Sequence, residues 1–139
     1  MKKITLLVPC YNEEAVVQQF YDRTTNIIKK LTNYEFELLF VNDGSKDNTL
    51  SIIKNLRAND SRVSYVDLSR NFGKETAMIA GIDYIESDAM IVMNADLQDP
   101  PELIPEMIKW WEAGYKDVCA KRKSRSGETW FKKWSSHTY

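Results

Sequence analysis

Oxygen-bearing side chains recur at every second position after one apolar run of the chain, at Asn94, Asp96 and Gln98. In an extended segment alternate side chains point the same way, so these three would share one side. Carboxylate and amide oxygens suit hard divalent cations such as Mg²⁺ or Mn²⁺, which keep waters and accept phosphate oxygens as further ligands. The spacing therefore predicts a metal site for a ligand that contains phosphate.

Polar segments also follow the other four predicted strands, at residues 9–14, 42–45, 69–74 and 121–123. Loops are polar in most proteins, and Asn, Asp, Gly and Ser also serve as turn residues and caps. Ligands of parallel sheets nevertheless bind beyond the carboxyl ends of the strands. We therefore expect all five strand exits to converge on one site.

The elements that would position these residues alternate between short apolar runs and longer helical patterns. Strands are predicted at residues 4–8, 36–41, 63–68, 89–93 and 115–120, and helices at residues 13–31, 47–59, 74–85 and 101–113. Asn12 is expected to cap the first helix. This alternation is typical of βαβ units, and it predicts an α/β fold with a mostly parallel sheet and helices on both faces.

The bulk composition excludes several classes of protein. The chain has 139 residues, 43% of them hydrophobic, and a formal net charge of −1, which favours one soluble domain and gives no general attraction to nucleic acid. No apolar run reaches the ~20 residues that span a bilayer, and no signal peptide is recognisable, so a cytoplasmic location is expected. Cys10 and Cys119 fit no metal or redox spacing and are expected to be reduced. His137, the single histidine, is expected to be solvated.

Two common phosphate-binding motifs are missing. The first strand is not followed by GxGxxG, and GxxxxGK[ST] does not occur. A dinucleotide site of the Rossmann type and a P-loop are therefore not supported.

Four segments, in order along the chain, resemble the motifs of family 2 glycosyltransferases with the GT-A fold. They are VPCYNEE at residues 8–14, VNDGSKDNT at 41–49, SRNFGKETA at 69–77 and NADLQDPPE at 94–102. The match is most similar to the branch that transfers a sugar to polyprenyl phosphate (undecaprenyl or dolichyl phosphate), as in cell envelope polysaccharide synthesis. The resemblance implies a GT-A-like (Rossmann-like) fold with the nucleotide site at the carboxyl edge of the sheet.

By this resemblance, the nucleotide-binding residues are Pro9, Tyr11, Glu13, Asp43 and Lys74. Tyr11 would pack on the base, and Asp43 would accept a hydrogen bond from it. Other interpretations stay open, namely core packing for Tyr11, an Asx turn for Asp43 and a solvated first turn of a helix for Lys74.

The resemblance also implies the catalytic and metal-binding residues. Asp96, with Asn94 and Gln98, would hold Mg²⁺ or Mn²⁺ on the diphosphate of the donor, and Arg122 would face the phosphates. Asp99 is expected to cap the helix that follows. The family usually begins this motif with aspartate, so Asn94 removes one negative charge, and a degenerate, inactive homologue is an alternative.

The implied reaction is transfer of a sugar from a nucleotide-diphosphate donor, with UDP favoured over GDP, to polyprenyl phosphate with inversion. A phosphate acceptor is largely dianionic near neutral pH and needs little help from a general base. Residues 1–120 would form the nucleotide-sugar-binding domain. Residues 121–139, basic and aromatic, are interpreted as a helical start of an acceptor-binding half that is missing, at the inner face of the membrane; a packed, solvated helix is the alternative.

Three other functions compete with this one. A sugar nucleotidyltransferase would carry a Gly-rich basic loop after the first strand, where this chain has Glu13 and Glu14. A non-catalytic module that binds a nucleotide or a partner stays open because of Asn94 and the short chain. A receiver-like signalling domain would carry a phosphorylatable aspartate after the third strand, but Ser69, Arg70 and Asn71 follow that strand here, so this alternative fails. An oligomer is compatible with the sequence, which does not reveal the oligomeric state.

Overall fold

A computed structural model describes residues 1–96, 98, 100–114, 117–122 and 129–134, and for the last two ranges it describes the backbone alone. By their internal contacts the residues form two compact units, Met1–Gln98 and Asp99–Tyr139.

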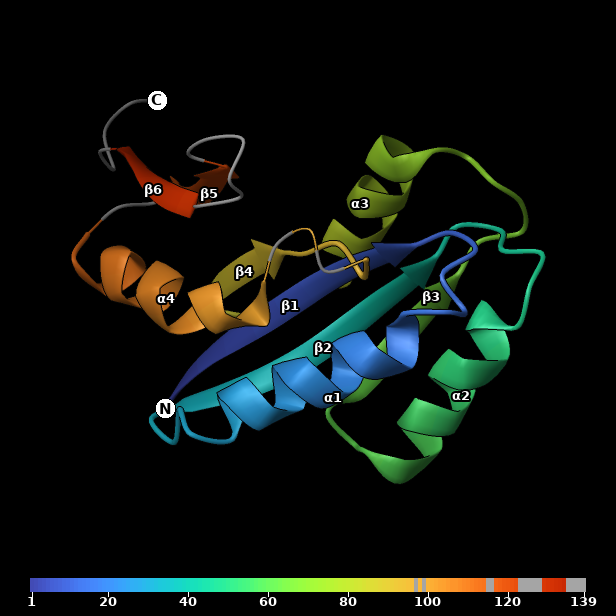
Figure 1. Ribbon diagram of the computed structural model, residues 1–139, viewed down its shortest axis with the longest axis horizontal. Coiled ribbons are helices and arrows are strands. Elements are labelled where there is room, and N and C mark those ends of the chain that lie inside the picture. Colours follow the sequence, from blue (N-terminus) through green and yellow to red (C-terminus); the bar gives the residue numbers. More distant parts are fainter. Residues whose placement is uncertain (97, 99, 115–116, 123–128, 135–139) are drawn as a thin grey trace. The chain divides into compact units, whose positions relative to one another are not determined.

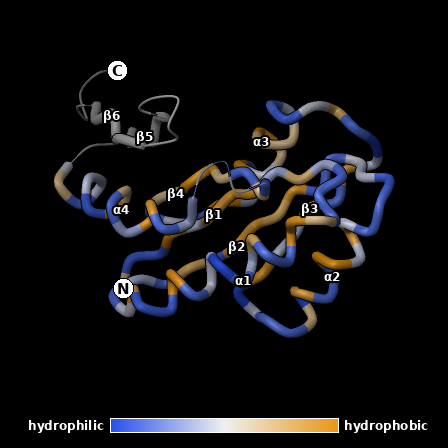
Figure 2. The backbone as a smooth tube through the Cα atoms, in the orientation of Figure 1, coloured by the Kyte–Doolittle hydropathy of each residue, from blue (hydrophilic) through white to orange (hydrophobic). Residues whose placement is uncertain are grey.

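The first unit is built on a parallel sheet of four strands in the order β3-β2-β1-β4 (Figure 1). The strands are β1 (Lys2–Cys10), β2 (Tyr34–Asn42), β3 (Val63–Asp67) and β4 (Ala89–Val92). Along β1 and β2 most side chains are buried, as expected for strands covered on both faces. Figure 2 shows the hydrophobic colouring along these two strands and the hydrophilic loops beyond them.

Two helices, α1 (Val17–Ile28) and α2 (Thr49–Asn59), contact each other on one side of the sheet. α1 buries Val17, Phe20, Thr24 and Ile28, which recur at helical spacing. The ring of Phe20 meets that of Phe40 edge to face, with centroids 6.3 Å apart. Because side chains alternate along β2, the neighbours of Phe40 point to the opposite face.

The opposite face is covered by α3 (Lys74–Ile82), which contacts β1 and β2. Its core combines Leu7, Leu39 and Val41 with Ala77. A Cβ atom at Gly81 would lie 2.5 Å from the Cδ1 atom of Leu7 and 2.8 Å from the Cγ2 atom of Val41, so a larger residue there would force these side chains to shift. Helices therefore cover both faces, which confirms the predicted α/β fold class.

The second unit contains a short 3₁₀ turn η1 (Pro101–Leu103), the helix α4 (Ile104–Glu112) and the strands β5 (Asp117–Arg122) and β6 (Thr129–Trp134). β5 and β6 form a separate antiparallel sheet. Two predictions are therefore wrong: the fifth strand pairs outside the parallel sheet, and residues 129–134 of the tail form a strand where a helix is predicted. β6 is rich in threonine and aromatic residues (Thr129, Trp130, Phe131 and Trp134), types that favour strands. Among the described residues, no helix has the length and apolar character that crossing a membrane requires.

The start of the first helix also differs from the prediction. α1 begins at Val17, its N-cap is Val16, and no side chain caps it. Residues 14–16 form a turn in which the Glu13 carbonyl accepts hydrogen bonds from the Val16 and Val17 amides. Asn12 is therefore not a helix cap, and its side chain bonds to another loop of the sheet edge.

Candidate functional site at the carboxyl edge of the sheet

Four loops leave the carboxyl ends of the parallel strands. We call them the first loop (residues 11–16), the second loop (43–48), the third loop (68–73) and the fourth loop (described at residues 93–96 and 98). Parallel pairing places the ends of β1, β2 and β3 at the same edge, with Cys10 opposite Asn42 and Asn42 opposite Asp67. The first three loops are joined by hydrogen bonds.

The first and second loops exchange hydrogen bonds in both directions. The Asn12 amide donates to the Ser45 Oγ atom at 2.9 Å, and the Lys46 amide donates to the Asn12 Oδ1 atom at 2.8 Å. Asn12 adopts a φ of 53°, in the left-handed region that asparagine tolerates better than most residues. Each loop thus supplies a side chain to the backbone of the other.

Further bonds continue this contact toward α2. The Glu13 amide donates to the Thr49 Oγ1 atom at 2.8 Å, and the Glu14 amide donates to the Asp47 Oδ2 atom at 3.2 Å. In return the Asn48 amide donates to the Glu14 Oε2 atom at 3.0 Å. The backbone amides of the first loop are therefore ordered by side chains of the second loop and of the start of α2.

Asp43 connects the second loop to the third. Its Oδ1 atom accepts a hydrogen bond from the Phe72 amide at 2.8 Å, and its Oδ2 atom accepts one from the Gly73 amide at 3.0 Å. The Asn71 side-chain amide bonds to the same carboxylate and to the Asp43 carbonyl, each at 3.2 Å. Asp43 is only 3% exposed, so this carboxylate organises the third loop from inside the protein.

Gly44 lets the two loops approach each other. It has a φ of 70°, and a Cβ atom there would lie 2.3 Å from the carbonyl carbon of Arg70 and from the amide nitrogen of Asn71. These neighbours are backbone atoms, so they cannot rotate away. Glycine in the NDGS segment is therefore required by a close backbone approach as well as by its conformation.

Residues assigned to the nucleotide by resemblance lie in different environments. Tyr11 is 42% exposed, which contradicts the core-packing alternative. Pro9 is buried within β1, and Lys74 is exposed at the first residue of α3. The structure brings Tyr11 and Asp43 onto loops that are bonded to one another, and Lys74 directly follows the third loop.

Carboxylates from three loops lie near one another at this edge. Burial raises the pKa of the Glu13 carboxyl, and the negative charges of Asp96 and Asp47 raise it further. Asp96 belongs to the fourth loop and Asp47 to the second. A site with unbalanced negative charge of this kind favours a cation, which would lower the electrostatic cost of the cluster.

The fourth loop does not stay extended. β4 ends at Val92, residues 95 and 96 form a turn, and the Gln98 amide donates to the Asp96 Oδ1 atom at 3.2 Å. The expected alternation of Asn94, Asp96 and Gln98 is therefore wrong, because the aspartate side chain bends its own backbone.

The donor set in the fourth loop still fits a hard cation in its chemistry. Asp96 and Gln98 are exposed and Asn94 is half-buried. Among the residues that the structure describes, no group of three or more His, Cys, Asp or Glu is placed to hold a metal ion. A cation here would therefore take most of its ligands from phosphate oxygens and water, as Mg²⁺ commonly does.

Some predicted roles lie outside the described side chains. Arg122 is the last residue of β5, which belongs to the separate sheet, so the shared-edge argument does not apply to it. Other predictions also fall on side chains that the structure does not describe: the cap at Asp99, the thiol of Cys119, the basic and aromatic side chains of the tail, and His137. Cys10 is a free, buried thiol.

An exposed pair in the third loop was not anticipated from the sequence. The Arg70 guanidinium lies 4.3 Å above the centre of the Phe72 ring, in a cation–π arrangement. The loop bonds described above were also missed, since the sequence shows Ser45, Asp47 and Asn71 only as ordinary turn residues. Their polar side chains indicate that they form hydrogen bonds, but their spacing in the sequence does not identify the partners.

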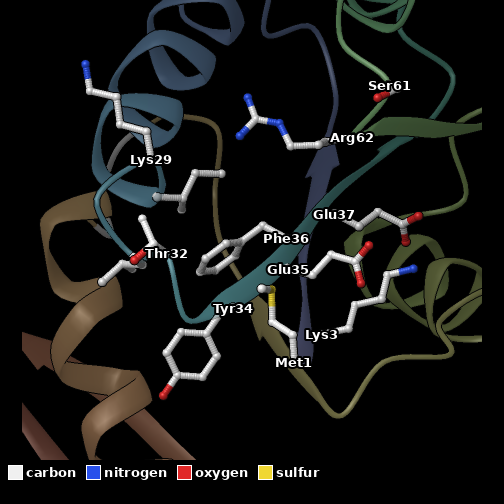
Figure 3. Close-up of a pocket in the computed structure, with 12 residues that line it drawn as sticks. Met1, Lys3, Lys29, Thr32, Tyr34, Glu35, Phe36, Glu37, Ser61 and Arg62 are labelled. Atoms are coloured by element: carbon white, nitrogen blue, oxygen red, sulfur yellow. The ribbon is translucent and has the colours of Figure 1, made fainter.

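The amino edge of the sheet holds a cavity of about 460 Å³ (Figure 3). Phe36 lies near its centre, with Tyr34 on one side and Arg62 on the other. The Arg62 guanidinium is already bonded to both oxygens of Asp60, at 3.0 and 2.8 Å. None of the residues predicted for the site lines this cavity.

The parallel sheet with bonded polar loops at its carboxyl edge defines an α/β protein with its candidate site at that edge. The chain belongs to glycosyl transferase family 2, whose model matches residues 5–139. It is 50% identical over 129 residues to the Bacillus subtilis protein named uncharacterized glycosyltransferase YkcC, covering 93% of this chain and 40% of that one. It is 48% identical over 124 residues to the prophage bactoprenol glucosyl transferase homolog of Escherichia coli K12, covering 89% and 40%. The chain thus spans about 40% of the length of these curated relatives.

Solved structures agree on the fold. The mannosyltransferase PcManGT of Pyrobaculum calidifontis, in complex with GDP-Man and Mn²⁺, matches with a TM-score of 0.66 at 20% identity, over 78% of this chain and 32% of that one. S. aureus TarS in complex with UDP matches with a TM-score of 0.64 at 21% identity, over 84% and 34%. The first unit therefore has the mostly parallel sheet of the GT-A glycosyltransferases.

Proposed function

We propose that this chain binds the nucleotide-diphosphate sugar donor of an inverting glycosyltransferase, with UDP as the favoured nucleotide. The observation that carries the proposal is the bonded arrangement of three loops. It leaves Tyr11 exposed on the same loop as Glu13, whose carboxylate lies close enough to Asp96 to be repelled by it. An exposed aromatic ring suits a base, and an unbalanced negative site suits a cation that carries phosphate. Family membership supports the same conclusion.

Each predicted residue has a defined task in this proposal. Tyr11 stacks on the base, beside Pro9 and Glu13. The Oδ1 atom of Asp43 accepts one hydrogen bond from the third loop, and a carboxylate oxygen has capacity for a second, from the base. Lys74, at the start of α3, approaches the phosphates.

The leaving diphosphate requires charge neutralisation. Asn94, Asp96 and Gln98 would hold Mg²⁺ or Mn²⁺, which would stabilise the negative charge that develops on the diphosphate. Arg122 would contribute a guanidinium, whose planar shape matches phosphate oxygens. The relative in complex with GDP-Man and Mn²⁺ supports the presence of a divalent cation in this fold.

We propose polyprenyl phosphate as the acceptor. Relatives named bactoprenol glucosyl transferase support this choice. A phosphate monoester is largely dianionic near neutral pH, so it attacks the sugar carbon directly and inverts it. The whole protein would act at the inner face of the membrane. Sugar transfer from UDP-glucose to undecaprenyl phosphate, but not to undecaprenol, is the expected product pattern in a thin-layer assay.

The donor site is tested by calorimetric titration of UDP, GDP and UDP-sugars with Mn²⁺ and then with EDTA. Wild type is expected to bind UDP only with the metal, and Asp96→Ala is expected to abolish that binding. Asp88→Ala is the matched control. Asp96 follows the carboxyl end of β4, whereas Asp88 lies just before its amino end, where its carboxylate accepts a hydrogen bond from the Lys3 amide. Absence of binding of every nucleotide by the wild type would overturn the proposal and favour a non-catalytic module.

A further inference from the structure

The residue between Tyr11 and Glu13 has an unusual backbone. Asn12 has a φ of 53° and is the one non-glycine with positive φ among the residues that the structure describes. This region is disfavoured for side chains with a Cβ, and asparagine and aspartate enter it more readily than other residues. Chain direction changes at this point, so Asn12 determines where the side chains of its two neighbours project.

Two reciprocal hydrogen bonds hold Asn12 in that conformation. Its amide donates to Ser45 Oγ at 2.9 Å, and its Oδ1 atom accepts from the Lys46 amide at 2.8 Å. Each bond joins a side chain of one loop to the backbone of the other. We call this pair of bonds the Asn12 clamp.

The Asn12 clamp is supported by the structure on both sides of it. On the chain's next residue, the Glu13 amide bonds to the Thr49 hydroxyl, which anchors the first loop to the start of α2. Behind the second loop, Gly44 is packed against the backbone of Arg70. The second loop is therefore a fixed surface against which Asn12 sets the first loop.

We propose that Asn12 is a positioning residue, which acts through the clamp to hold the Tyr11 ring and the Glu13 carboxylate in the orientation that receives the nucleoside. This inference rests on the proposed function, since it assigns a cause to the affinity of that same site. Preorganised side chains bind more tightly because less conformational entropy is lost on binding. In this proposal the Asn12 clamp affects binding of the nucleoside, while the fourth loop affects binding of the metal and the phosphates.

Three substitutions separate backbone conformation from hydrogen bonding. Asn12→Gly keeps the left-handed conformation accessible and removes the Oδ1 acceptor. Asn12→Asp keeps both, so it should act as the rescue variant. Ser45→Ala removes the other bond of the clamp, and combined with Asn12→Gly it should add little to the single effect.

Amide exchange measured by NMR on the protein without nucleotide tests the clamp itself. Asn12→Gly is expected to speed exchange of the Lys46 amide by about tenfold or more, because its acceptor is lost. Asn12→Asp should stay close to wild type. Unchanged exchange of Lys46 in Asn12→Gly would show that the clamp does not order this loop and would overturn the inference.

Titrations with UDP and with pyrophosphate, both with Mn²⁺, test the role. Asn12→Gly is expected to weaken UDP binding by about tenfold while leaving pyrophosphate binding and the melting temperature nearly unchanged. Equal loss for both ligands would indicate general disruption, and loss of UDP binding in Asn12→Asp as large as in Asn12→Gly would indicate direct contact of the amide with the nucleotide. Either result overturns the positioning role. If the wild type binds no nucleotide, both the proposed function and the positioning role of Asn12 fail. Slow exchange of the Lys46 amide would then show only that the Asn12 clamp exists.

Discussion

The two edges of the parallel sheet are built from the same strands but are stabilised differently. At the carboxyl edge, hydrogen bonds run from loop to loop: Asn12, Asp43 and Asp47 each connect segments that are about 30 or more residues apart. At the amino edge, Arg62 bonds to Asp60 within one turn, the Tyr21 hydroxyl of α1 donates to Asp60, and the Lys3 amide of β1 donates to Asp88. Loops at the carboxyl edge therefore bond to one another, while at the amino edge the long-range bonds join a turn to a helix or to a strand.

The two edges also differ in how their carboxylates are surrounded by charge. Burial and the neighbouring charges of Asp96 and Asp47 raise the pKa of Glu13 at the carboxyl edge. At the amino edge, hydrogen bonds from Arg62 are the largest cause that lowers the pKa of Asp60 to about 2. An edge whose carboxylates are paired has already satisfied its charges, and an edge whose carboxylates repel one another is open to a cation. This comparison places the candidate site at the carboxyl edge although the large cavity lies at the other.

The largest effect is expected for Gly44→Ala. A Cβ atom there would overlap backbone atoms of the third loop, so the free energy of unfolding should fall by about 3 kcal/mol or more. Gly114→Ala is the matched control, because Gly114 also has positive φ but nothing within 4 Å of its added Cβ, and about 1 kcal/mol is expected. Urea denaturation measures both. Equal losses would mean that backbone conformation alone requires glycine at Gly44.

Asp43→Asn should have the next largest effect. The variant places an NH₂ group against one of the amides of Phe72 and Gly73, so a buried donor loses its acceptor, at a cost of about 2 kcal/mol. Denaturation and amide exchange of residues 72 and 73 should change together. Asp67→Asn, at the exposed end of β3, is the control. It should change neither the free energy of unfolding nor the amide exchange of residues 72 and 73 by much. A stable variant with slow exchange at residues 72 and 73 would contradict the proposed role of Asp43 in holding the third loop.

At the amino edge, Phe36→Leu should lower the free energy of unfolding by about 1 kcal/mol, since it trims a ring that lines the cavity but keeps the site apolar. UDP binding is expected to be unchanged, because the residue lies at the edge away from the loops. A large loss of UDP affinity without loss of stability would break the proposed division between the edges.

The two edges should respond to acid with opposite sign. Asp60 has a folded pKa of about 2 against an ordinary value of 3.8, so its stabilisation is full above about pH 4 and is lost as the pH falls toward 2. Because Arg62 is 41% exposed, solvent screens the pair, and about 1 kcal/mol is a realistic size. The raised pKa of Glu13 means that its folded carboxyl binds a proton more tightly than the unfolded one, so protonation of Glu13 adds stability as the pH falls through its folded pKa toward 4.5.

Stability curves from pH 2 to 7 for wild type, Asp60→Asn and Glu13→Gln resolve these contributions. Asp60→Asn should flatten the fall below pH 4, and Glu13→Gln should raise stability near neutral pH, where the wild-type carboxylate is repelled by Asp96 and Asp47. Adding Mn²⁺ should reduce the gain from Glu13→Gln if the cation relieves the same repulsion. The same acid response in all three proteins would remove the electrostatic difference between the edges.

The sequence alone determined the fold class and most of the elements. Four of the five predicted strands join the parallel sheet, because apolar runs of strand length between amphipathic helices leave few other arrangements. It also placed polar loops at the carboxyl edge and identified the family, through motifs whose order is visible without any coordinates. The predicted roles of the nucleotide and metal residues remain predictions.

Only the tertiary structure decided how the loops meet. Asn12 reads as a helix cap from its position before an acidic stretch, but its partners Ser45 and Lys46 lie more than 30 residues away. Asp43 likewise reads as a turn residue, and its acceptor role toward the third loop depends on the parallel register of β2 and β3. Likewise β5 was predicted from its apolar character to join the sheet, and it pairs with β6 in a separate one. Local residue types specify which hydrogen bonds a segment is able to make, and the folded chain alone determines which partner comes within reach.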